Sequence, residues 1–152
     1  MTNVTLRNLT KISLNEWYAG KQVCTYIKHQ QMTEAEFEKQ LTRIAPLYGC
    51  RYFKIPDTKM INKNNRKSNR EQKRPFDGIL VTESGNYCIE CKVDSNTLKP
   101  HQKVNLDDIN KINGRGFVLR VRNRKQRVYV IECNGKTLVE FGTIDELIKQ
   151  FI

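Results

Sequence analysis

The sequence predicts an α/β or α+β domain in which helices flank a central mixed β-sheet. Three observations lead to this expectation. The chain has 152 residues, 38% of them hydrophobic and 28% charged, which suits one compact domain with its own core. Segments with the period-two alternation of strands are interspersed with segments whose apolar residues recur at helical spacing. Two turn motifs, at residues 83–86 and 134–135, predict hairpins.

The first 32 residues are expected to form a helical extension ahead of a domain over residues 33–152. Within the extension, Ser13 and Glu16 make a candidate capping box. Apolar residues over 13–30 then roughly follow one helical face. No internal repeat is visible, so we expect a single compact domain overall.

A second helix follows a clearer capping box, formed by Thr33 and Glu36. The apolar residues that then recur at helical spacing are Phe37, Leu41, Ile44 and Ala45. Pro46 and Gly49 predict the end of this helix. Residues 50–55, C-R-Y-F-K-I, alternate in polarity and include aromatic side chains, which predicts a strand.

The next two strands are predicted over residues 76–82 and 87–93, joined by the loop E-S-G-N at 83–86. A helix is expected to begin near Pro100, because proline suits the first helical position. The N-G pair at 113–114 predicts where this helix ends.

A strand over residues 117–121 and a second hairpin are expected to complete the sheet. Strands over 127–133 and 136–141 flank the N-G pair at 134–135, which is typical of a two-residue type I′ turn. The last helix opens on a T-x-x-E capping box at 143–146.

The charge of the chain indicates a polyanionic partner. Lys and Arg number 27 against 16 Asp and Glu, a formal net charge of +11, and such an excess most often serves nucleic acid. A basic surface kept for solubility is the alternative. A membrane-surface protein would need a basic amphipathic helix with a large apolar face, and none is evident, so no membrane partner is expected.

Cysteine usage and hydropathy predict a soluble, reduced, cytoplasmic protein. The five cysteines are Cys24, Cys50, Cys88, Cys91 and Cys133. Their odd number and irregular spacing argue against a secreted disulfide framework. No apolar run resembles a secretory signal or a membrane span. Cys88 and Cys91 lie three apart on a predicted strand and so face opposite sides, which favours core cysteines over a zinc half-site.

Residues 57–75 form a predicted long polar loop that is rich in asparagine. Its seven basic residues are Lys59, Lys63, Arg66, Lys67, Arg70, Lys73 and Arg74. A solvated surface loop is one interpretation. So many charges of one sign favour the other, an arm that follows the phosphates of DNA.

Charged residues interrupt the predicted strand 87–93. Glu90 and Lys92 are two residues apart and therefore share one face. With the four-residue loop at 83–86, Asp77 falls opposite Lys92 and diagonal to Glu90. Two close carboxylates repel unless a cation lies between them. A hard divalent ion, Mg²⁺ or Mn²⁺ in its place, would fit their oxygens; an ordinary ion pair with Lys92 is the alternative.

The motifs F-D-G and C-I-E-C-K, after a helix containing E-F-E-K-Q-L, resemble the PD-(D/E)xK nuclease superfamily. L-K-P-H-Q, a helix and then G-F-V-L-R are similar to two of its branches. These are the stand-alone virus-type replication-repair nuclease domains and the Holliday junction resolvases, including the bacterial RecU-like type. The similarity spans residues 34 to about 122. It implies a restriction-endonuclease-like core, and virus or phage origin is compatible with it.

The resemblance also implies roles for individual residues. Asp77 and Glu90 would be acidic ligands of Mg²⁺, with the backbone carbonyl of Cys91 as a third ligand. Lys92 would be the catalytic lysine. Gln102 matches a glutamine found near the start of the following helix. No small-molecule cofactor is implied.

The family also has an acidic residue on the helix before the first strand, and this sequence differs from the family pattern at two positions. Glu38 best matches the acid that completes the metal environment, with Glu34 and Glu36 as less favoured substitutes. Phe76 stands where the family has proline before the first aspartate. Lys99 replaces a polar residue before the helix proline, which adds a cation where phosphate could pass.

A second basic run lies at the end of the predicted strand 117–121. Arg120 and Arg122 share one face of that strand. They are candidates for DNA backbone contacts. The alternative is a sheet edge that its charges protect from aggregation.

The leading hypothesis is a metal-dependent DNA endonuclease that acts on branched DNA such as a four-way junction. Symmetric cleavage of a junction needs two active sites, so a homodimer is expected. The N-terminal helix with Trp17 could form that contact or cap the core instead. The alternatives are a linear-duplex or nicking endonuclease of restriction or phage-replication type, and a non-catalytic nucleic-acid-binding module.

Overall fold

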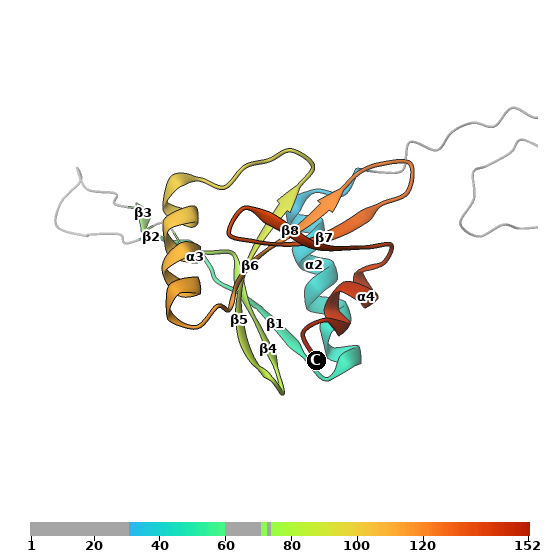
Figure 1. Cartoon of the computed structure of the whole chain (residues 1–152), viewed down its shortest axis with the longest axis horizontal. Coiled ribbons are helices and arrows are strands. Elements are labelled where there is room, and N and C mark those ends of the chain that lie inside the picture. Colours follow the sequence, from blue (N-terminus) through green and yellow to red (C-terminus); the bar gives the residue numbers. More distant parts are fainter. Residues whose placement is uncertain (1–30, 60–70, 73) are drawn as a thin grey trace, which may run out of the picture. The chain divides into compact units, whose positions relative to one another are not determined.

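The computed structural model describes residues 31–59, 71–72 and 74–152 (Figure 1). The chain divides into two units, Met1–Gln31 and Met32–Ile152, and the described elements belong to the second. The helix predicted over residues 13–30 lies outside the described residues.

A mixed sheet forms the centre of this unit. Within the described residues it has six strands in the order β1-β4-β5-β6-β7-β8. The strands are β1 Arg51–Lys54, β4 Gly78–Thr82, β5 Gly85–Val93, β6 Gly116–Arg122, β7 Val128–Cys133 and β8 Lys136–Phe141. β5 and β6 are parallel, and the other neighbours pair antiparallel. The predicted α+β architecture with a central mixed sheet flanked by helices is confirmed.

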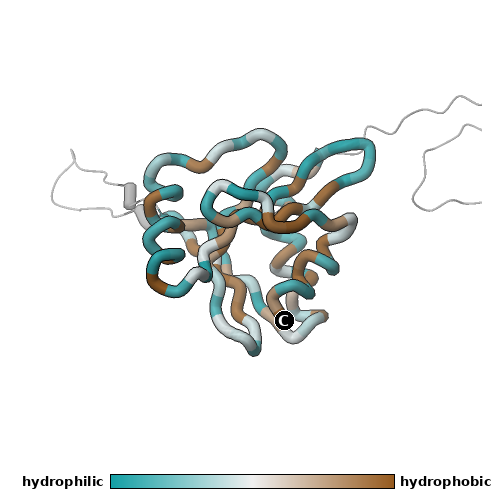
Figure 2. Tube along the Cα trace, in the orientation of Figure 1, coloured by the Kyte–Doolittle hydropathy of each residue, from teal (hydrophilic) through white to brown (hydrophobic). Residues whose placement is uncertain are grey.

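Helices lie against both faces of this sheet (Figure 1). They are α2 Glu34–Ile44, with a 3₁₀ turn η1 Ala45–Tyr48 after it, α3 Pro100–Ile112 and α4 Ile144–Lys149. α2 and α4 share a large apolar cluster with one face of the sheet, to which Phe37 and Leu147 contribute. α3 packs through Leu106 against a smaller cluster that includes Phe76 and Val118. Figure 2 shows hydrophobic residues both along the central strands and in α4.

Alternation along β5 sends its side chains to these two clusters in turn. Ile89, Cys91 and Val93 belong to the large cluster. Cys88 packs against the small one, beneath α3. Because side chains alternate along a strand, the even-numbered residues that follow Cys88 also face α3. The two cysteines of the C-x-x-C motif therefore lie on opposite faces, as predicted.

Local signals account for the ends of these elements. The Thr33 hydroxyl accepts a hydrogen bond from the Glu36 backbone N–H at the start of α2. A complete capping box opens α4 at Thr143. Asn134 and the glycine after it have φ of 50° and 74°, which the predicted type I′ turn requires.

The β4–β5 hairpin is tighter than predicted. Thr82 pairs with Gly85, so two residues form the turn instead of the four at 83–86. Gly85 has a φ of 144°, in a region that residues with a side chain rarely adopt. The Thr82 hydroxyl donates to the Gly85 carbonyl at 3.2 Å. Glycine at the start of β5 therefore lets the chain reverse two residues earlier than the sequence pattern indicates.

This turn changes the cross-strand partner of Asp77. Continuing the ladder beyond the Gly78–Ile89 pair places Asp77 opposite Glu90, so the prediction that it lies opposite Lys92 is wrong. The register is shifted by two residues. Because the side-chain period of a strand is also two, Asp77 stays on the Glu90 side.

The predicted loop over residues 57–75 contains a short antiparallel pair. β2, Thr58–Lys59, pairs with β3, Glu71–Gln72. Most of the loop between them lies outside the described residues. Among the helices that the structure describes, none is long and apolar enough to cross a membrane.

Candidate active site

The site lies where β4 and β5 separate. Their ladder ends at the Gly78–Ile89 pair, although β5 continues to Val93. Beyond that pair, the Asp77 side chain takes the place of the missing strand: Oδ2 accepts a 2.8 Å hydrogen bond from the Cys91 backbone N–H. The Asp77 carbonyl accepts from the Ile55 N–H at 2.8 Å. Backbone bonds therefore position this buried carboxylate on both sides.

Three side chains from β5 and α3 meet next to Asp77. The Lys92 ammonium donates to Glu90 Oε1 at 2.7 Å. The Gln102 amide donates to the same oxygen at 2.5 Å, while its carbonyl oxygen accepts from the Lys99 N–H. Glu90, Lys92 and Gln102 are each at most 5% exposed. Gln102 thus ties the first turn of α3 to the carboxylate on β5.

α2 contributes two further acids, one helical turn apart. Glu38 is buried, and its Oε2 lies 3.0 Å from the Lys54 ammonium without the geometry of a hydrogen bond. Glu34 is more exposed, and its Oε1 lies 3.8 Å from the Lys92 ammonium. Asn96 donates a hydrogen bond to the same Glu34 oxygen. The i, i+4 spacing places both acids on one helix face.

Arg74 joins the acids directly. Its Nη2 lies 2.5 Å from Asp77 Oδ1, and its Nε lies 3.9 Å from Asp57. The side chain is 22% exposed. Burial opposes the charged form, yet the carboxylates of Asp77, Asp57, Glu38 and Glu90 outweigh it and raise the pKa of Arg74. This guanidinium therefore faces the whole acidic cluster.

Glu90 has the most perturbed carboxyl of the cluster. Burial raises its pKa to about 7, and the neighbouring Asp77 carboxylate acts in the same direction. The hydrogen bond from Lys92 opposes this shift in the pKa. A buried carboxyl group whose pKa is strongly raised beside other charged groups is typical of functional sites.

The donor set suits a hard divalent ion. Glu90 Oε2 is buried and has no hydrogen-bond partner among the described atoms, which is costly for a carboxylate unless something positive binds it. Carboxylate oxygens are the ligands that Mg²⁺ prefers. Within the described part of the chain, however, no three Asp, Glu, His or Cys side chains form a ready-made metal cluster. Ion binding therefore requires some of the present contacts to open.

The predicted DNA-binding residues fall into three groups. Lys63, Arg66, Lys67, Arg70 and Lys73 lie outside the described residues. For Lys59 the structure describes only a backbone position, in β2. Lys99 is exposed at the start of α3, next to Gln102, whereas Arg74 lies among the acids.

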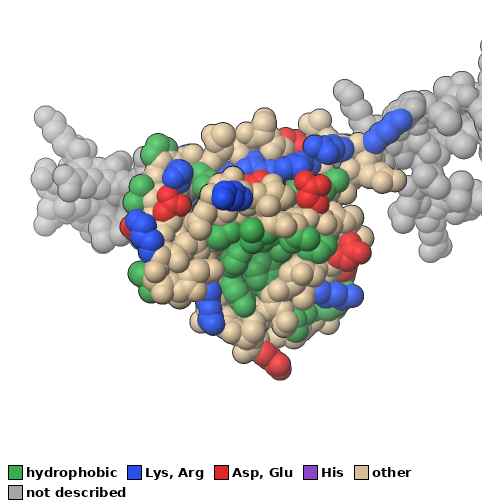
Figure 3. All heavy atoms as spheres, in the orientation of Figure 1, with side chains coloured by type: hydrophobic (Ala, Val, Ile, Leu, Met, Phe, Trp, Pro, Cys, Tyr) green, Lys and Arg blue, Asp and Glu red, His purple; other side chains and the backbone are tan. Residues whose placement is uncertain are grey.

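Arg120 and Arg122 lie on β6 and are used structurally. The Arg120 guanidinium binds both Glu132 oxygens, at 2.7 and 3.1 Å. It also donates to the carbonyls of Asp94 and Asn96, which holds the chain after β5. Arg122 pairs with a glutamate on β8 at 2.6 Å. Basic side chains gather along one margin of the face in Figure 3. The Arg120 and Arg122 guanidinium groups bind acidic side chains of the protein itself.

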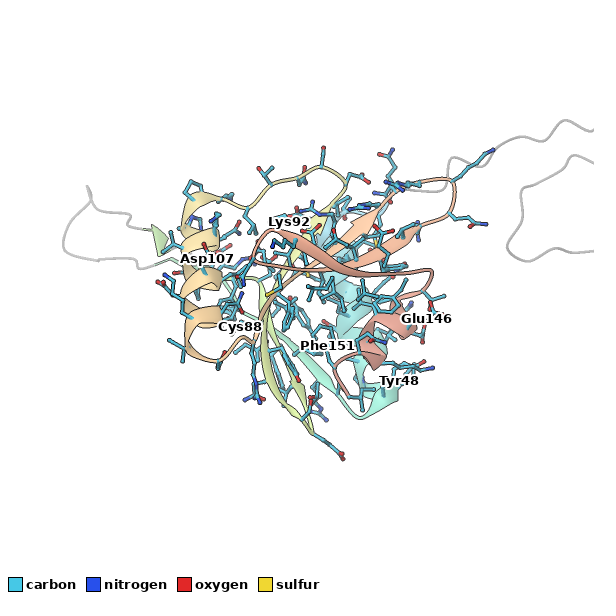
Figure 4. All side chains as sticks on the ribbon, viewed as in Figure 1. Tyr48, Cys88, Lys92, Asp107, Glu146 and Phe151 are labelled. Atoms are coloured by element: carbon cyan, nitrogen blue, oxygen red, sulfur yellow. The ribbon has the colours of Figure 1, made fainter. Side chains whose placement is uncertain are left out.

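Two contributors to the site, Lys54 and Asp57, were not predicted from the sequence. Lys54 reaches Glu38 because β1 pairs with β4, which sets Lys54 beside Gly78. Asp57 lies 3.9 Å from Arg74. Neither has a motif, since both depend on a strand pairing between distant segments. In Figure 4 Lys92 lies among the central strands, whereas Asp107 lies on α3 and away from it.

No protein-family model matches the chain, and no curated protein sequence matches it either. Among solved structures, the chain is similar to the 1.6 Å structure of Hjc, a Holliday junction resolvase from the archaeal hyperthermophile Archaeoglobus fulgidus. The match has 14% sequence identity and a TM-score of 0.43, and it covers 76% of this chain and 98% of that one.

Proposed function

We propose that this protein is a metal-dependent endonuclease of the PD-(D/E)xK type that hydrolyses phosphodiester bonds of DNA. One observation carries the proposal: Asp77, Glu90 and Lys92 converge with Gln102 in a buried cluster whose Glu90 Oε2 has no hydrogen-bond partner. The formal charge of +11 supports a polyanionic substrate.

In the proposed mechanism, Asp77, Glu90, the Cys91 carbonyl and Glu38 would hold Mg²⁺, or Mn²⁺ in its place. The ion, when bound, supplies an activated water and stabilises the charged transition state. Gln102 holds Glu90 by donating to Oε1, which leaves Oε2 directed to other partners. The Lys92 ammonium would donate to the attacking water or to a phosphate oxygen.

Branched DNA is the proposed substrate class, because the L-K-P-H-Q segment and its helix resemble those of junction resolvases. A homodimer follows from this proposal, since a four-way junction is resolved by two symmetric cuts. A linear-duplex or nicking activity is distinguished by comparing DNA shapes in one assay.

The test is cleavage of labelled linear, nicked and four-way-junction DNA in Mg²⁺ or in EDTA. We expect Mg²⁺-dependent cleavage, fastest on the junction, and loss of cleavage in Asp77→Ala and Lys92→Ala. Asp107→Ala is the control, because Asp107 is a carboxylate on α3 that pairs with exposed Lys103. The proposal fails if no substrate is cut, or if either site variant keeps full activity.

A non-catalytic DNA-binding module is the second candidate. The ion pairs Arg74–Asp77 and Lys92–Glu90 favour it, because they neutralise these acids without a metal. Salt-sensitive DNA binding that is indifferent to Mg²⁺, together with no cleavage of any of the three substrates, would support this reading.

A further inference from the structure

We infer that Arg74 is an internal counter-ion of Asp77 that a divalent cation must displace, so that metal binding releases the guanidinium to a substrate phosphate. This inference rests on the proposed function. It adds a role for Arg74 at the acidic cluster, beyond the general DNA contact predicted for the basic segment.

Both oxygens of Asp77 are engaged. Oδ2 accepts from the Cys91 N–H, a backbone group that cannot move without opening β5. Oδ1 lies 2.5 Å from Arg74 Nη2. A cation that binds Oδ1 therefore competes with the guanidinium for that oxygen. Because a guanidinium and a divalent ion repel each other strongly at such a distance in a buried site, the two exclude one another.

Glu90 shows the opposite arrangement. Lys92 and Gln102 both donate to Oε1, and Oε2 has no hydrogen-bond partner. Glu90 can bind an ion through Oε2 while it keeps both donors. Arg74 is therefore the cation that has to leave, whereas Lys92 can stay.

The Arg74 side chain is also able to move away from Asp77. Its side chain is 22% exposed against 2% for Asp77, so the guanidinium lies at the solvent side of the pair. Its second contact, at 3.9 Å from Asp57, is long. A guanidinium binds phosphate in a forked geometry, so DNA next to the ion offers it a new partner. Metal and DNA binding are then expected to reinforce each other.

The competing explanation is that Arg74 only anchors the chain ahead of β4. An anchor would stabilise the protein equally with and without an ion. A displaceable counter-ion stabilises only the metal-free protein. The two explanations are therefore separated by how the effect of an Arg74 substitution changes on adding metal.

The experiment measures Mn²⁺ affinity by titration calorimetry, and melting temperature in EDTA and in saturating Mn²⁺, on the full chain without DNA. Arg74→Ala is expected to bind Mn²⁺ about tenfold more tightly than the natural protein, because the ion no longer competes with a buried ion pair. It should melt lower in EDTA, and this deficit should shrink in Mn²⁺. Arg74→Lys keeps the charge and should bind Mn²⁺ with affinity close to that of the natural protein.

Arg122→Ala is the matched control. Its side chain is 26% exposed, and its guanidinium on β6 pairs with Glu140 on β8 at 2.6 Å. Its Mn²⁺ affinity should not change, and any melting deficit should be equal in both conditions. The inference about Arg74 is wrong if Arg74→Ala binds Mn²⁺ no more tightly than the natural protein, or if Mn²⁺ does not reduce its melting-temperature deficit. The proposed function still stands in that case, provided that the natural protein binds Mn²⁺ and cuts DNA. Absence of Mn²⁺ binding in every variant overturns the proposed function as well.

Discussion

At the scale of single residues, Glu90 is well hydrogen-bonded but lies where burial disfavours its charged form. It is fully buried, it accepts from Lys92 and Gln102 through one oxygen, and burial raises the pKa of its carboxyl to about 7. Above that pH the folded, metal-free protein has to keep a charge that water would solvate better. A buried carboxylate that lowers the stability of the metal-free protein, yet is held in place by two donors, is best explained by a role in binding a cation.

Glu90→Gln is predicted to abolish cleavage and to stabilise the metal-free protein. The glutamine keeps an oxygen for Lys92 and Gln102 but carries no charge. The pKa of Glu90 is raised above its usual 4.5, so the natural protein loses stability as the pH rises from about 4.5 to about 7. The variant should gain on the order of 1 to 3 kcal/mol at pH 8 and nearly nothing at pH 4.5.

Thermal unfolding in EDTA across this pH range measures the effect on stability. Glu132→Gln is the comparison, since this glutamate is part-buried in an ion pair with Arg120. It should lower stability instead. A Glu90→Gln variant that is less stable than the natural protein at pH 8 would contradict the prediction.

At the scale of elements, the site depends on close packing of β1 against the start of β4. The Tyr52 ring lies over Gly78, and its hydroxyl is 3.9 Å from the Cys91 sulfur. A Cβ at Gly78 would lie 2.5 Å from the ring and 2.6 Å from the Phe53 carbonyl oxygen. Gly78 thus lets the strand carrying Asp77 approach β1.

Gly78→Ala is predicted to destabilise the protein by about 1–3 kcal/mol, because the added methyl overpacks a rigid ring and a backbone carbonyl. It should also reduce cleavage, since Asp77 directly precedes the displaced residue. Denaturant unfolding checks the first effect. At Gly142, where the nearest atom to an added Cβ is 3.8 Å away, alanine should change stability by less than about 0.5 kcal/mol. Equal effects at the two glycines would refute this packing argument.

At the scale of the whole molecule, the net charge of +11 predicts that DNA binding is mainly electrostatic. Binding measured in EDTA, where cleavage is prevented, should weaken by a factor of about 10³ or more between 50 and 200 mM salt. A flat dependence on salt would argue against a nucleic-acid partner.

Two lysines at opposite ends of α3 test where this binding takes place. Lys99 precedes Gln102 at the site end of the helix, and Lys111 lies in the last turn, paired with Asp108. Lys99→Ala should reduce the slope of log affinity against log salt by about one. Lys111→Ala should leave the slope unchanged.

Local sequence determined much of this protein. The capping residues Thr33 and Thr143 and the N-G pair at 134–135 act within a few residues of themselves, so their helices and turn were predictable. Strand alternation likewise placed Glu90 and Lys92 on one face, and this held because the period of two is a property of the strand itself.

Tertiary structure decided the remainder. A two-residue turn, permitted by Gly85, placed Asp77 opposite Glu90 instead of Lys92. Pairing of distant strands brought Lys54 to Glu38, and packing directed Arg74 to Asp77. The Lys54–Glu38 contact joins a strand to a helix. Arg74 precedes Asp77 by only three residues, but the carboxylates packed around its guanidinium come from other segments as well. The register of the strands and the choice of ion-pair partners depend on which arrangement buries apolar side chains and pairs charges best across the whole sheet. A local motif does not contain this information.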